Sequence, residues 1–445
     1  MTTTKTIPFG MTIAPYAATS LARRRVLRSI ATAGAVALTL GAPGLAAQAD
    51  DTIKIGILLP LSGNFAPNGQ QALTGMKMYF DEIGNTAAGH KLELIVEDTQ
   101  GKPDVGVTKA RKEVERDGAQ VLTGVVSSGV ALAVNDYSRE NKVPLVLSGD
   151  AGADELTMPG PLTNPYLIRT SQNGRSVSAP AADWAYKKGW RKVTIIGSDY
   201  AGGVDTNHAF AQAFCALGGK VIQEQWPPIG TSDFGPYLTN LDRTADAVVT
   251  FEPGADGLRF GQQFSEFGLK GKLPVLDIYG TIVYEPNLPQ LGDGALGIYS
   301  SLFYAAMLKT PENDRFVAEL KKRTGNLPSN EGPNGYTGAR AIADAITAVK
   351  GDLTDTMKFM AALKAVKFPS PKGDLSLDKY GQVIQSMFIR EVQKVDGQLA
   401  NVPIATYANI DQFWPFTEAE FAEYKYSYKE LKGSLTDCGK LLAKK

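Results

Sequence analysis

The feature that most constrains the fold of this chain is a regular alternation of short β-branched runs with amphipathic segments. Apolar side chains recur at helical spacing in the first amphipathic segment, at Leu73, Met76, Phe80 and Ile83. Because strands alternating with helices form a parallel sheet covered on both faces, the sequence predicts a doubly wound α/β fold. The expected strands are residues 53–59, 92–97, 121–125 and 144–147, and the expected helices are residues 69–83, 104–116 and 130–140.

The pattern restarts near residue 176, so two similar blocks of roughly 120 residues stand in tandem. The second block predicts helices at residues 176–188, 204–217, 234–241 and 256–267, and strands at residues 193–197, 221–226, 247–251 and 273–278. From about residue 299 the chain becomes mainly helical, at residues 311–324, 333–349 and 353–366. Two extended runs, residues 383–393 and 399–407, predict a β-hairpin around Asp396-Gly397. An aromatic tail after Ile410 is expected to pack on one of the blocks.

The first 49 residues have the pattern of an export signal. They contain five basic residues and no acidic residue, then an Ala/Leu/Gly-rich stretch and the A-x-A sequence Ala47-Gln48-Ala49. The stretch is too short and too weakly apolar to anchor the protein in a membrane, and a disordered tail is the alternative. Arg23-Arg24 resembles a twin-arginine signal, which leaves the Sec and twin-arginine routes both open. We therefore expect a periplasmic protein.

The composition of the mature chain excludes several functions. Removal of the leader leaves 41 basic against 46 acidic residues, a net charge of −5, and no basic stripe suited to nucleic acid. The two histidines, His90 and His208, offer little for a zinc site or a catalytic triad, so we expect no enzyme, metal or cofactor. The glycines at 292, 294 and 297 precede an extended run rather than a helix, which indicates a loop and not a dinucleotide site.

The two cysteines leave two readings open. Cys215 and Cys438 could form a disulfide in an oxidising compartment, or each could be a small buried apolar residue.

Three loops of the first block follow predicted strands, where α/β proteins bind ligands. They are residues 60–69, 125–129 and 148–152. Ser127-Ser128-Gly129 combines hydroxyl groups with the start of a helix, which suits an anion, although a simple helix cap would use the same residues.

Several ordered motifs resemble the leucine/isoleucine/valine-binding protein family, the type I periplasmic binding proteins of ATP-driven transporters. The resemblance covers about residues 53–410, and it rests on Leu61-Ser62-Gly63, Glu97-Asp98-Thr99, Val126-Ser127-Ser128, Asp199-Tyr200-Ala201, Phe267-Gly268-Leu269-Lys270-Gly271 and Gly335-Tyr336-Thr337-Gly338-Ala339. It implies two doubly wound lobes joined by three hinge crossovers. The implied division is residues 50–170 with 300–380 in lobe 1, residues 171–299 with 381–412 in lobe 2, and residues 413–445 as an aromatic-rich C-terminal extension.

The resemblance also implies a ligand site in the cleft between the lobes. Ser128, with neighbouring backbone amides at Val126 and Ser127, would hold a ligand carboxylate, while Asp150, Gly152 and Asp277 match the positions that hold an ammonium group. Gly152 replaces the usual threonine and Asp150 replaces a small residue, which puts α-amino-acid binding in doubt. Further candidates for the cleft wall are Asn68, Tyr200, Glu252 and Tyr279.

The expected function is that of a monomeric substrate-binding component of an ABC transporter. Such a protein captures a small carboxylate by hinge closure and presents it to a membrane permease. The C-terminal Asn409-Ile410-Asp411-Gln412-Phe413-Trp414 resembles a branch that binds aromatic and other carboxylates. A periplasmic sensing subunit is the alternative, although no membrane helix follows Lys445, as a fused sensor would require.

Overall fold

The computed structural model describes residues 52–424 and 433–445. Residues 50–445 form one compact unit, and the expected export signal lies outside the described residues. Among the residues described, no helix has both the length and the apolar character to cross a bilayer.

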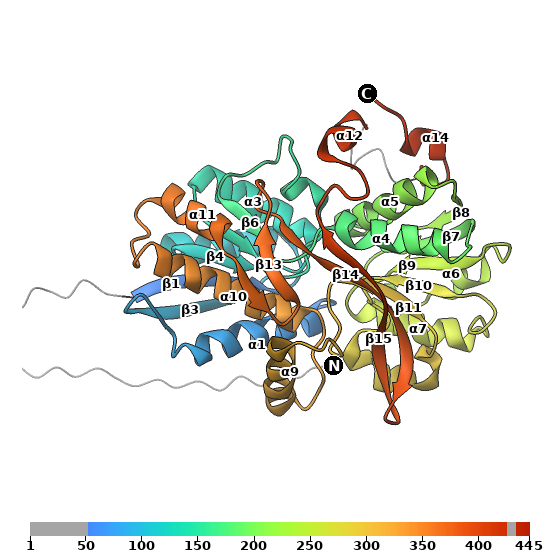
Figure 1. The fold of residues 1–445 in the computed structure, drawn as a ribbon, viewed down its shortest axis with the longest axis horizontal. Coiled ribbons are helices and arrows are strands. Elements are labelled where there is room, and N and C mark those ends of the chain that lie inside the picture. Colours follow the sequence, from blue (N-terminus) through green and yellow to red (C-terminus); the bar gives the residue numbers. More distant parts are fainter. Residues whose placement is uncertain (1–51, 425–432) are drawn as a thin grey trace, which may run out of the picture. The chain divides into compact units, whose positions relative to one another are not determined.

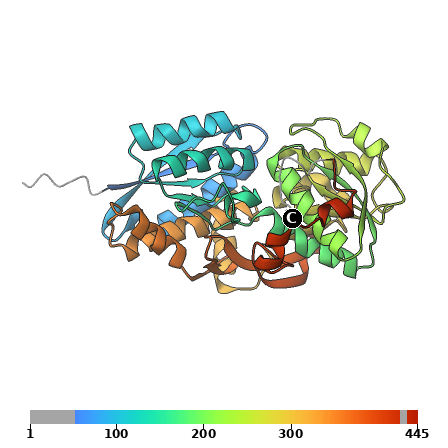
Figure 2. The same ribbon diagram turned by 90° about the horizontal axis from the view of Figure 1, so that it is seen from above.

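The first lobe is a doubly wound sheet with the strand order β2-β3-β1-β4-β5-β6. All of its neighbours are parallel except β2 and β3. Its strands are β1 Thr52–Leu59, β2 Thr86–Ala87, β3 His90–Asp98, β4 Val121–Gly124, β5 Leu145–Leu147 and β6 Leu167–Arg169. Its helices are α1 Ala66–Glu82, α2 Pro103–Arg111, α3 Ser128–Asn141, α9 Pro311–Thr324, α10 Glu331–Ala348 and α11 Thr356–Ala365. Two buried apolar clusters cover the two faces of this sheet, and Figure 2 shows helices on both sides of it.

The second lobe is built around a mixed sheet. Strands β8, β7, β9, β10 and β11 run parallel, and β14 then adds to β11 in antiparallel fashion. The strands are β7 Lys192–Gly197, β8 Lys220–Gln225, β9 Ala247–Phe251, β10 Val275–Ile278, β11 Tyr299–Leu302, β14 Val383–Val395 and β15 Gln398–Ile410. The helices are α4 Gly174–Lys187, α5 Ala201–Ala216, α6 Gly235–Thr239, α7 Ala255–Glu266 and α8 Leu288–Leu291. Apolar clusters again lie on both faces.

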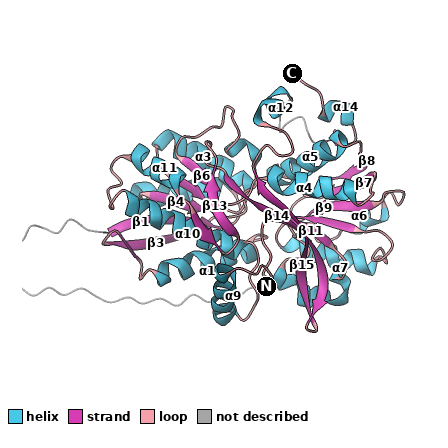
Figure 3. Ribbon diagram, viewed as in Figure 1, coloured by secondary structure: helices cyan, strands magenta, loops and turns pink. Residues whose placement is uncertain are grey.

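The chain passes between the two sheets three times: after β6, after β11, and where β12 Phe368–Ser370 and β13 Gly373–Leu377 lead into β14. Figures 1 and 3 show β14 and β15 as a long hairpin that begins beside the first lobe and extends along the second. At the crossovers, the buried guanidinium of Arg169 donates to the carbonyls of Ala151 and Ala153 at 3.0 and 2.8 Å and to Gln382 Oε1 at 2.6 Å. Arg169 therefore joins the first crossover to the third.

Most of the expected elements are confirmed, with differences at their ends. The first helix begins at Ala66 rather than at residue 69, because Pro67 is tolerated within the first turn. The helix expected at residues 104–116 becomes π-helical from Lys112 to Arg116. The hairpin is confirmed, with Asp396 and Gly397 both at positive φ in its turn. Strands β12 and β13 were not predicted, since Pro369, Pro371 and Gly373 interrupt the strand pattern.

The described part of the C-terminal extension contacts both lobes rather than one block. Phe413 and Phe421 cluster with Met158, which lies between β5 and β6 of the first lobe. Phe421 also packs under the guanidinium of Arg175 in α4 of the second lobe, 4.4 Å from the ring centre. The helices in this extension are α12 Glu418–Glu423 and α14 Cys438–Leu441.

Cys215 and Cys438 form a disulfide, which decides between the two readings of these residues. The bond joins α5 to α14 across 223 residues of sequence.

The disulfide generates a first prediction. Replacing both cysteines, Cys215→Ser with Cys438→Ser, should lower the free energy of unfolding by about 2 to 4 kcal/mol, because the crosslink restricts the unfolded chain. Urea denaturation of the variant and of the wild type measures this loss, and wild type in reducing agent should match the variant. Equal stability of all three would contradict the prediction.

A second prediction concerns Glu113, which is fully buried behind β1. Its Oε1 accepts the Ile57 N–H at 3.1 Å, and Oε2 has no partner among the described residues. Burial raises the pKa of Glu113 to about 9, with Glu97 adding to the effect. The folded protein therefore keeps this proton while the unfolded chain loses it, so stability falls as pH rises from the ordinary value of 4.5 towards 9.

Glu113→Gln removes this titration. Between about pH 5.5 and pH 8.5, we expect wild type to lose at least about 1 kcal/mol more stability than the variant. Urea unfolding at both pH values measures the difference, and parallel pH profiles would show that Glu113 is ionised in the folded state.

Candidate functional site

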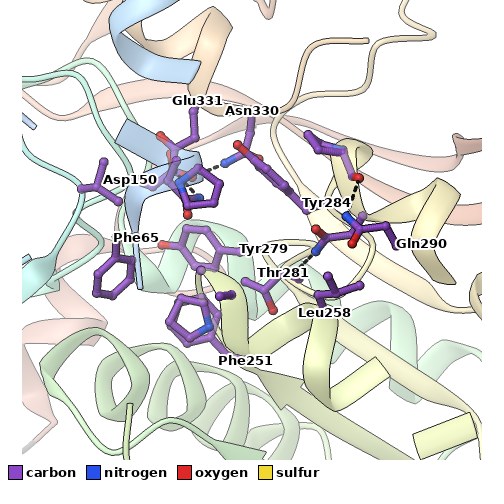
Figure 4. A pocket seen from close by; sticks show the side chains of 18 of the residues that line it. Phe65, Asp150, Phe251, Leu258, Tyr279, Thr281, Tyr284, Gln290, Asn330 and Glu331 are labelled. Atoms are coloured by element: carbon purple, nitrogen blue, oxygen red, sulfur yellow. Dashed lines mark hydrogen bonds between the residues drawn. The ribbon is translucent and has the colours of Figure 1, made fainter. Parts of the chain in front are cut away.

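A cavity of about 210 Å³ lies between the lobes, at the carboxyl ends of the parallel strands. Figure 4 shows side chains from both lobes around it. The first lobe contributes Phe65, Pro67, Asn68, Val126, Asp150, Asn330 and Glu331. The second lobe contributes Tyr200, Phe251, Pro253, Gly254, Ala255, Leu258, Tyr279, Thr281, Tyr284, Pro286, Asn287 and Gln290.

Four helices begin at this cavity. Their N-cap residues, Phe65 of α1, Tyr200 of α5, Gly254 of α7 and Asn330 of α10, all line it. The first turn of a helix leaves backbone N–H groups without intrahelical acceptors and carries a partial positive charge. The described residues of the lining include no lysine, arginine or histidine. Helix starts are therefore the positive features that this lining offers to an anion.

Two carboxyl groups, Asp150 and Glu331, form the acidic part of the wall. Asp150 follows β5, and Glu331 is the first residue of α10. The two side chains are hydrogen bonded to each other, and burial raises the pKa of both, that of Glu331 well above its ordinary value. The neutral form of Glu331 is therefore favoured beside Asp150, because two charges so close in a buried site repel each other.

Amide side chains hold this acid pair in place. Asp150 accepts hydrogen bonds from Gln172 at 2.9 Å, from Asn334 at 2.6 Å and from Asn330. Glu331 accepts one from Asn68 at 3.0 Å.

A buried ammonium group supports the pair from behind. Lys372 donates to Asn334 Oδ1 at 2.7 Å and to the Thr170 carbonyl at 2.5 Å. Burial lowers its pKa to about 7, although the nearby Asp150 acts in the opposite direction. Lys372 is thus linked to Asp150 through Asn334, and it does not line the cavity itself.

Five aromatic rings form a further part of the wall. Tyr200 stacks on Phe251 at a centroid distance of 6.3 Å, and Phe251 packs against Tyr279 at 5.1 Å. Phe65 approaches Tyr200 from the first lobe at 6.2 Å, and Tyr284 lines the far side. Such rings provide a flat apolar surface for a ligand that is itself flat.

Tyr279 is held in an unusual conformation. Its backbone has φ of 68°, which is uncommon for a residue other than glycine, and its buried hydroxyl has no hydrogen-bond partner among the described residues. Figure 4 shows its ring between Phe251 and Asp150. Gly152 lies against it, since a Cβ atom at that position would stand 2.5 Å from the tyrosine oxygen. The glycine therefore makes the space that the phenol occupies.

Half of the ten residues singled out from the sequence line the cavity: Asn68, Val126, Asp150, Tyr200 and Tyr279. The other half lie behind the lining. Four of them are almost fully buried: Ser127, Ser128, Glu252 and Asp277. The fifth, Gly152, is covered by Tyr279. Ser128 Oγ accepts the Gly152 N–H at 3.1 Å and so fixes the loop that carries Asp150.

Glu252 and Asp277 support the wall of the second lobe. Asp277 accepts hydrogen bonds from the backbone N–H groups of Thr281, Ile282 and Val283, at 2.9, 2.8 and 3.1 Å. Burial raises its pKa to about 6 despite these bonds. Glu252 accepts a 2.5 Å hydrogen bond from Ser198, and burial raises its pKa well above the ordinary value.

Sequence reasoning missed several lining residues. Phe251 ends the predicted strand at residues 247–251 and directly precedes the candidate Glu252, so its position at a strand end was a signal that could have found it. Glu331 and Asn330 had no such signal, because the helix was expected to begin at residue 333 and lies far from the other loops in sequence. Among the described residues, no group of His, Cys, Asp or Glu is arranged to hold a metal ion.

Comparison with known proteins agrees with this geometry. A family profile described as periplasmic binding protein matches residues 52–398. A Leu/Ile/Val-binding protein homolog 6 of Brucella melitensis is 34% identical over 382 residues, which cover 84% of this chain and 96% of the relative. One similar structure is a solute-binding protein of an ABC transporter from Rhodopseudomonas palustris BisB5, solved with 3,4-dihydroxybenzoic acid. Its TM-score is 0.77 and its sequence identity 33%, and the match covers 81% of this chain and 99% of that one.

A second such protein, from Rhodopseudomonas palustris HaA2 with p-hydroxybenzoic acid, has a TM-score of 0.77 and 35% identity, covering 81% of this chain and 98% of that one. The profile spans most of the chain, and these relatives match it over nearly their whole lengths. The chain therefore belongs to the periplasmic binding protein family and is a substrate-binding protein of the ABC transporter type.

Proposed function

We propose that this protein captures a small aromatic carboxylate that carries a hydrogen-bond donor, and delivers it to the permease of an ABC transporter. The observation that carries the proposal is the composition of the interlobe cavity: aromatic side chains, four helix starts, and the pair of carboxyl groups of Asp150 and Glu331. The protein works in the periplasm as a monomer without enzymatic activity, after export directed by residues 1–49.

The carboxylate of the ligand is bound by the helix starts. An anion gains from free N–H groups and from the positive end of the helix dipole, so it needs no cationic side chain. The acid pair repels a carboxylate, which directs that group away from the start of α10, where Glu331 lies, and towards the other helix starts. The two similar binding proteins that were solved with hydroxylated benzoic acids support this ligand class.

The other end of the ligand carries a hydroxyl group that donates to the acid pair. Asp150 and Glu331 together have more acceptor positions than the surrounding amides fill, and a phenol matches them without adding charge. The ring of Tyr279 stands beside them and contributes an aromatic face to the wall.

An α-amino acid suits this cavity less well. Gly152 occupies the position where the resemblance to the leucine/isoleucine/valine-binding family expects threonine, so the threonine hydroxyl is missing from this loop. The Tyr279 ring fills the space instead, which shortens the cavity and adds an aromatic face.

All ten sequence-selected residues take part in this proposal. Asn68, Val126, Asp150, Tyr200 and Tyr279 contact the ligand, whereas Ser127, Ser128, Gly152, Glu252 and Asp277 act by positioning them. We assign residues 50–170 with 303–380 to lobe 1 and residues 171–302 with 381–412 to lobe 2, because β11 belongs to the second sheet and moves the expected boundary at residue 300 to its end. The crossovers form the hinge, and its closure presents both lobes to the permease.

Ligand screening tests the proposal directly. With 4-hydroxybenzoate at about 100 times its dissociation constant, the free energy of unfolding should rise by about 2.7 kcal/mol. Benzoate should bind about tenfold more weakly, because it leaves the acid pair without the donor. Calorimetric titration measures both affinities, with leucine as the aliphatic comparison. Tighter binding of leucine than of either benzoate would refute the aromatic assignment.

Asp150→Asn sharpens this test. The substitution removes half of the acid pair, so the preference for 4-hydroxybenzoate over benzoate should fall from about tenfold towards equality. Asp396→Asn in the exposed hairpin turn is the matched control, and it should keep the full preference. An unchanged preference in Asp150→Asn would mean that the hydroxyl group binds elsewhere.

A further prediction concerns the fit between Gly152 and Tyr279. Gly152→Ala places a methyl group against the tyrosine oxygen, displaces the ring, and should weaken 4-hydroxybenzoate binding about tenfold or more. Tyr279→Phe removes the oxygen and leaves the ring carbon at an ordinary 3.4 Å from that methyl group. Adding Gly152→Ala to Tyr279→Phe should therefore cost much less than adding it to wild type. Equal costs in the two backgrounds, measured by calorimetry, would contradict the packing argument.

A further inference from the structure

Lys372 is buried at a position where lysine is normally exposed. Together with Pro371 it forms the two-residue turn between β12 and β13, next to the paired residues Ser370 and Gly373. Such turns usually lie in water, and a lysine is almost never fully buried without a charged partner. Lys372 is nevertheless only 3% exposed. Its contacts must therefore compensate for the cost of burying an ammonium group.

The hairpin itself does not need this ammonium group. Ser370 Oγ donates to the carbonyl of Gly373 at 2.6 Å and so closes the turn. The side chains of Phe368 and Leu375 anchor the two strands in the apolar core of the first lobe. An apolar side chain at position 372 would satisfy the same turn without a buried charge.

The ammonium group contacts all three crossovers between the lobes. Its Nζ donates at 2.5 Å to the carbonyl of Thr170, which directly follows β6 in the first crossover. It lies 4.8 Å from the ring centre of Phe303, which directly follows β11 in the second. Lys372 itself belongs to the third crossover. It therefore lies where the segments of the hinge converge.

One amide side chain connects this ammonium group to the ligand cavity. Lys372 Nζ donates to Asn334 Oδ1 at 2.7 Å, and Asn334 Nδ2 donates to Asp150 Oδ1 at 2.6 Å. Because a charged lysine only donates, it fixes the amide with the oxygen towards Lys372 and the nitrogen towards Asp150. Asp150 lines the ligand cavity and is only half-buried. The contacts of Lys372 thus orient a donor to a carboxyl group of the ligand site.

The charge of Lys372 acts on Asp150 as well. Burial raises the pKa of Asp150, whereas its hydrogen bonds and the positive charge of Lys372 act in the opposite direction. The other groups in contact with Lys372 are uncharged, namely a carbonyl, an amide oxygen and a phenyl ring. Lys372 therefore favours the ionised form of Asp150, which accepts hydrogen bonds and donates none.

We propose that Lys372 is a positioning residue that sets the preference of the ligand site for a hydroxyl group at the end of the ligand that meets Asp150. A carboxylate accepts a hydroxyl group more strongly than a neutral carboxyl group does. A ligand with a bare C–H edge leaves that carboxylate desolvated and without a donor. The preference rests on the proposed function, whereas the action of Lys372 on Asp150 does not.

Calorimetry at about pH 6 tests the preference, because burial lowers the pKa of Lys372 only to about 7 and the side chain still carries its proton there. Wild type should bind 4-hydroxybenzoate about tenfold more tightly than benzoate. Lys372→Met keeps a side chain of similar length without charge or donors, so the preference should fall to about threefold or less. Lys367→Met, at an exposed position just before β12, is the matched control and should keep the full preference. An unchanged preference in Lys372→Met would overturn the proposal.

Lys372→Gln separates the charge from the hydrogen bonds. Glutamine can still donate to Thr170 and Asn334 but carries no charge, so the preference should fall nearly as far as in Lys372→Met. A full tenfold preference in Lys372→Gln would overturn the role of the charge. This variant also decides the question if Lys372→Met does not fold.

The action on Asp150 is measured without any ligand. In protein whose aspartates carry ¹³C in the side-chain carboxyl group, the Asp150 resonance, assigned with Asp150→Asn, reports the ionisation of this residue. Lys372→Met and Lys372→Gln should move its titration to higher pH, because both remove a nearby positive charge, and Lys367→Met should not. A purely structural lysine would leave the titration where it is, and that result would refute the proposal. If 4-hydroxybenzoate does not bind at all, the proposed transport ligand fails, while the Asp150 titration still decides whether Lys372 acts on this carboxyl group.

Discussion

The structure depends above all on how the buried guanidinium of Arg169 is satisfied. Burial of a charge is costly unless hydrogen bonds compensate it, and here the partners come from two distant parts of the chain. The carbonyls of Ala151 and Ala153 belong to the first lobe, and Gln382 belongs to the last crossover. Since Arg169 ends β6, where the chain first leaves that lobe, one side chain fixes the crossovers together and also holds the loop that carries Asp150.

The chemistry of the ligand cavity follows from how the two lobes are arranged. Parallel strands from both lobes end at the same place. Helices α1, α5 and α7 follow three of these strands, and α10 begins there after α9, so positive helix ends gather without any cationic side chain in the described lining. The acid pair of Asp150 and Glu331 gives the cavity an acidic region in addition to the positive helix ends. The aromatic wall between the helix ends and the acid pair then favours a flat ligand that carries a different polar group at each end.

Sequence reasoning recovered the elements better than the site. The strand at residues 53–59 and the hairpin around Asp396-Gly397 follow from local periodicity and turn chemistry, so both were predictable. Asp150 and Tyr279 were found because they follow strands. Glu331 was missed because it reaches the cavity from α10, about 180 residues after its partner, and no local pattern records that approach. Ser128 was placed at the right loop, but its hydroxyl faces Gly152 and not the cavity.

The sequence by itself determined the fold class, the family and the absence of enzyme motifs, because periodicity and ordered motifs are properties of neighbouring residues. Tertiary structure alone decided the pairing of Cys215 with Cys438, the raised pKa values of Asp150 and Glu331, and the space that Gly152 leaves for Tyr279. Each of these depends on distances between residues that are far apart along the chain. Such distances are set only when the packed lobes and their crossovers bring the residues together.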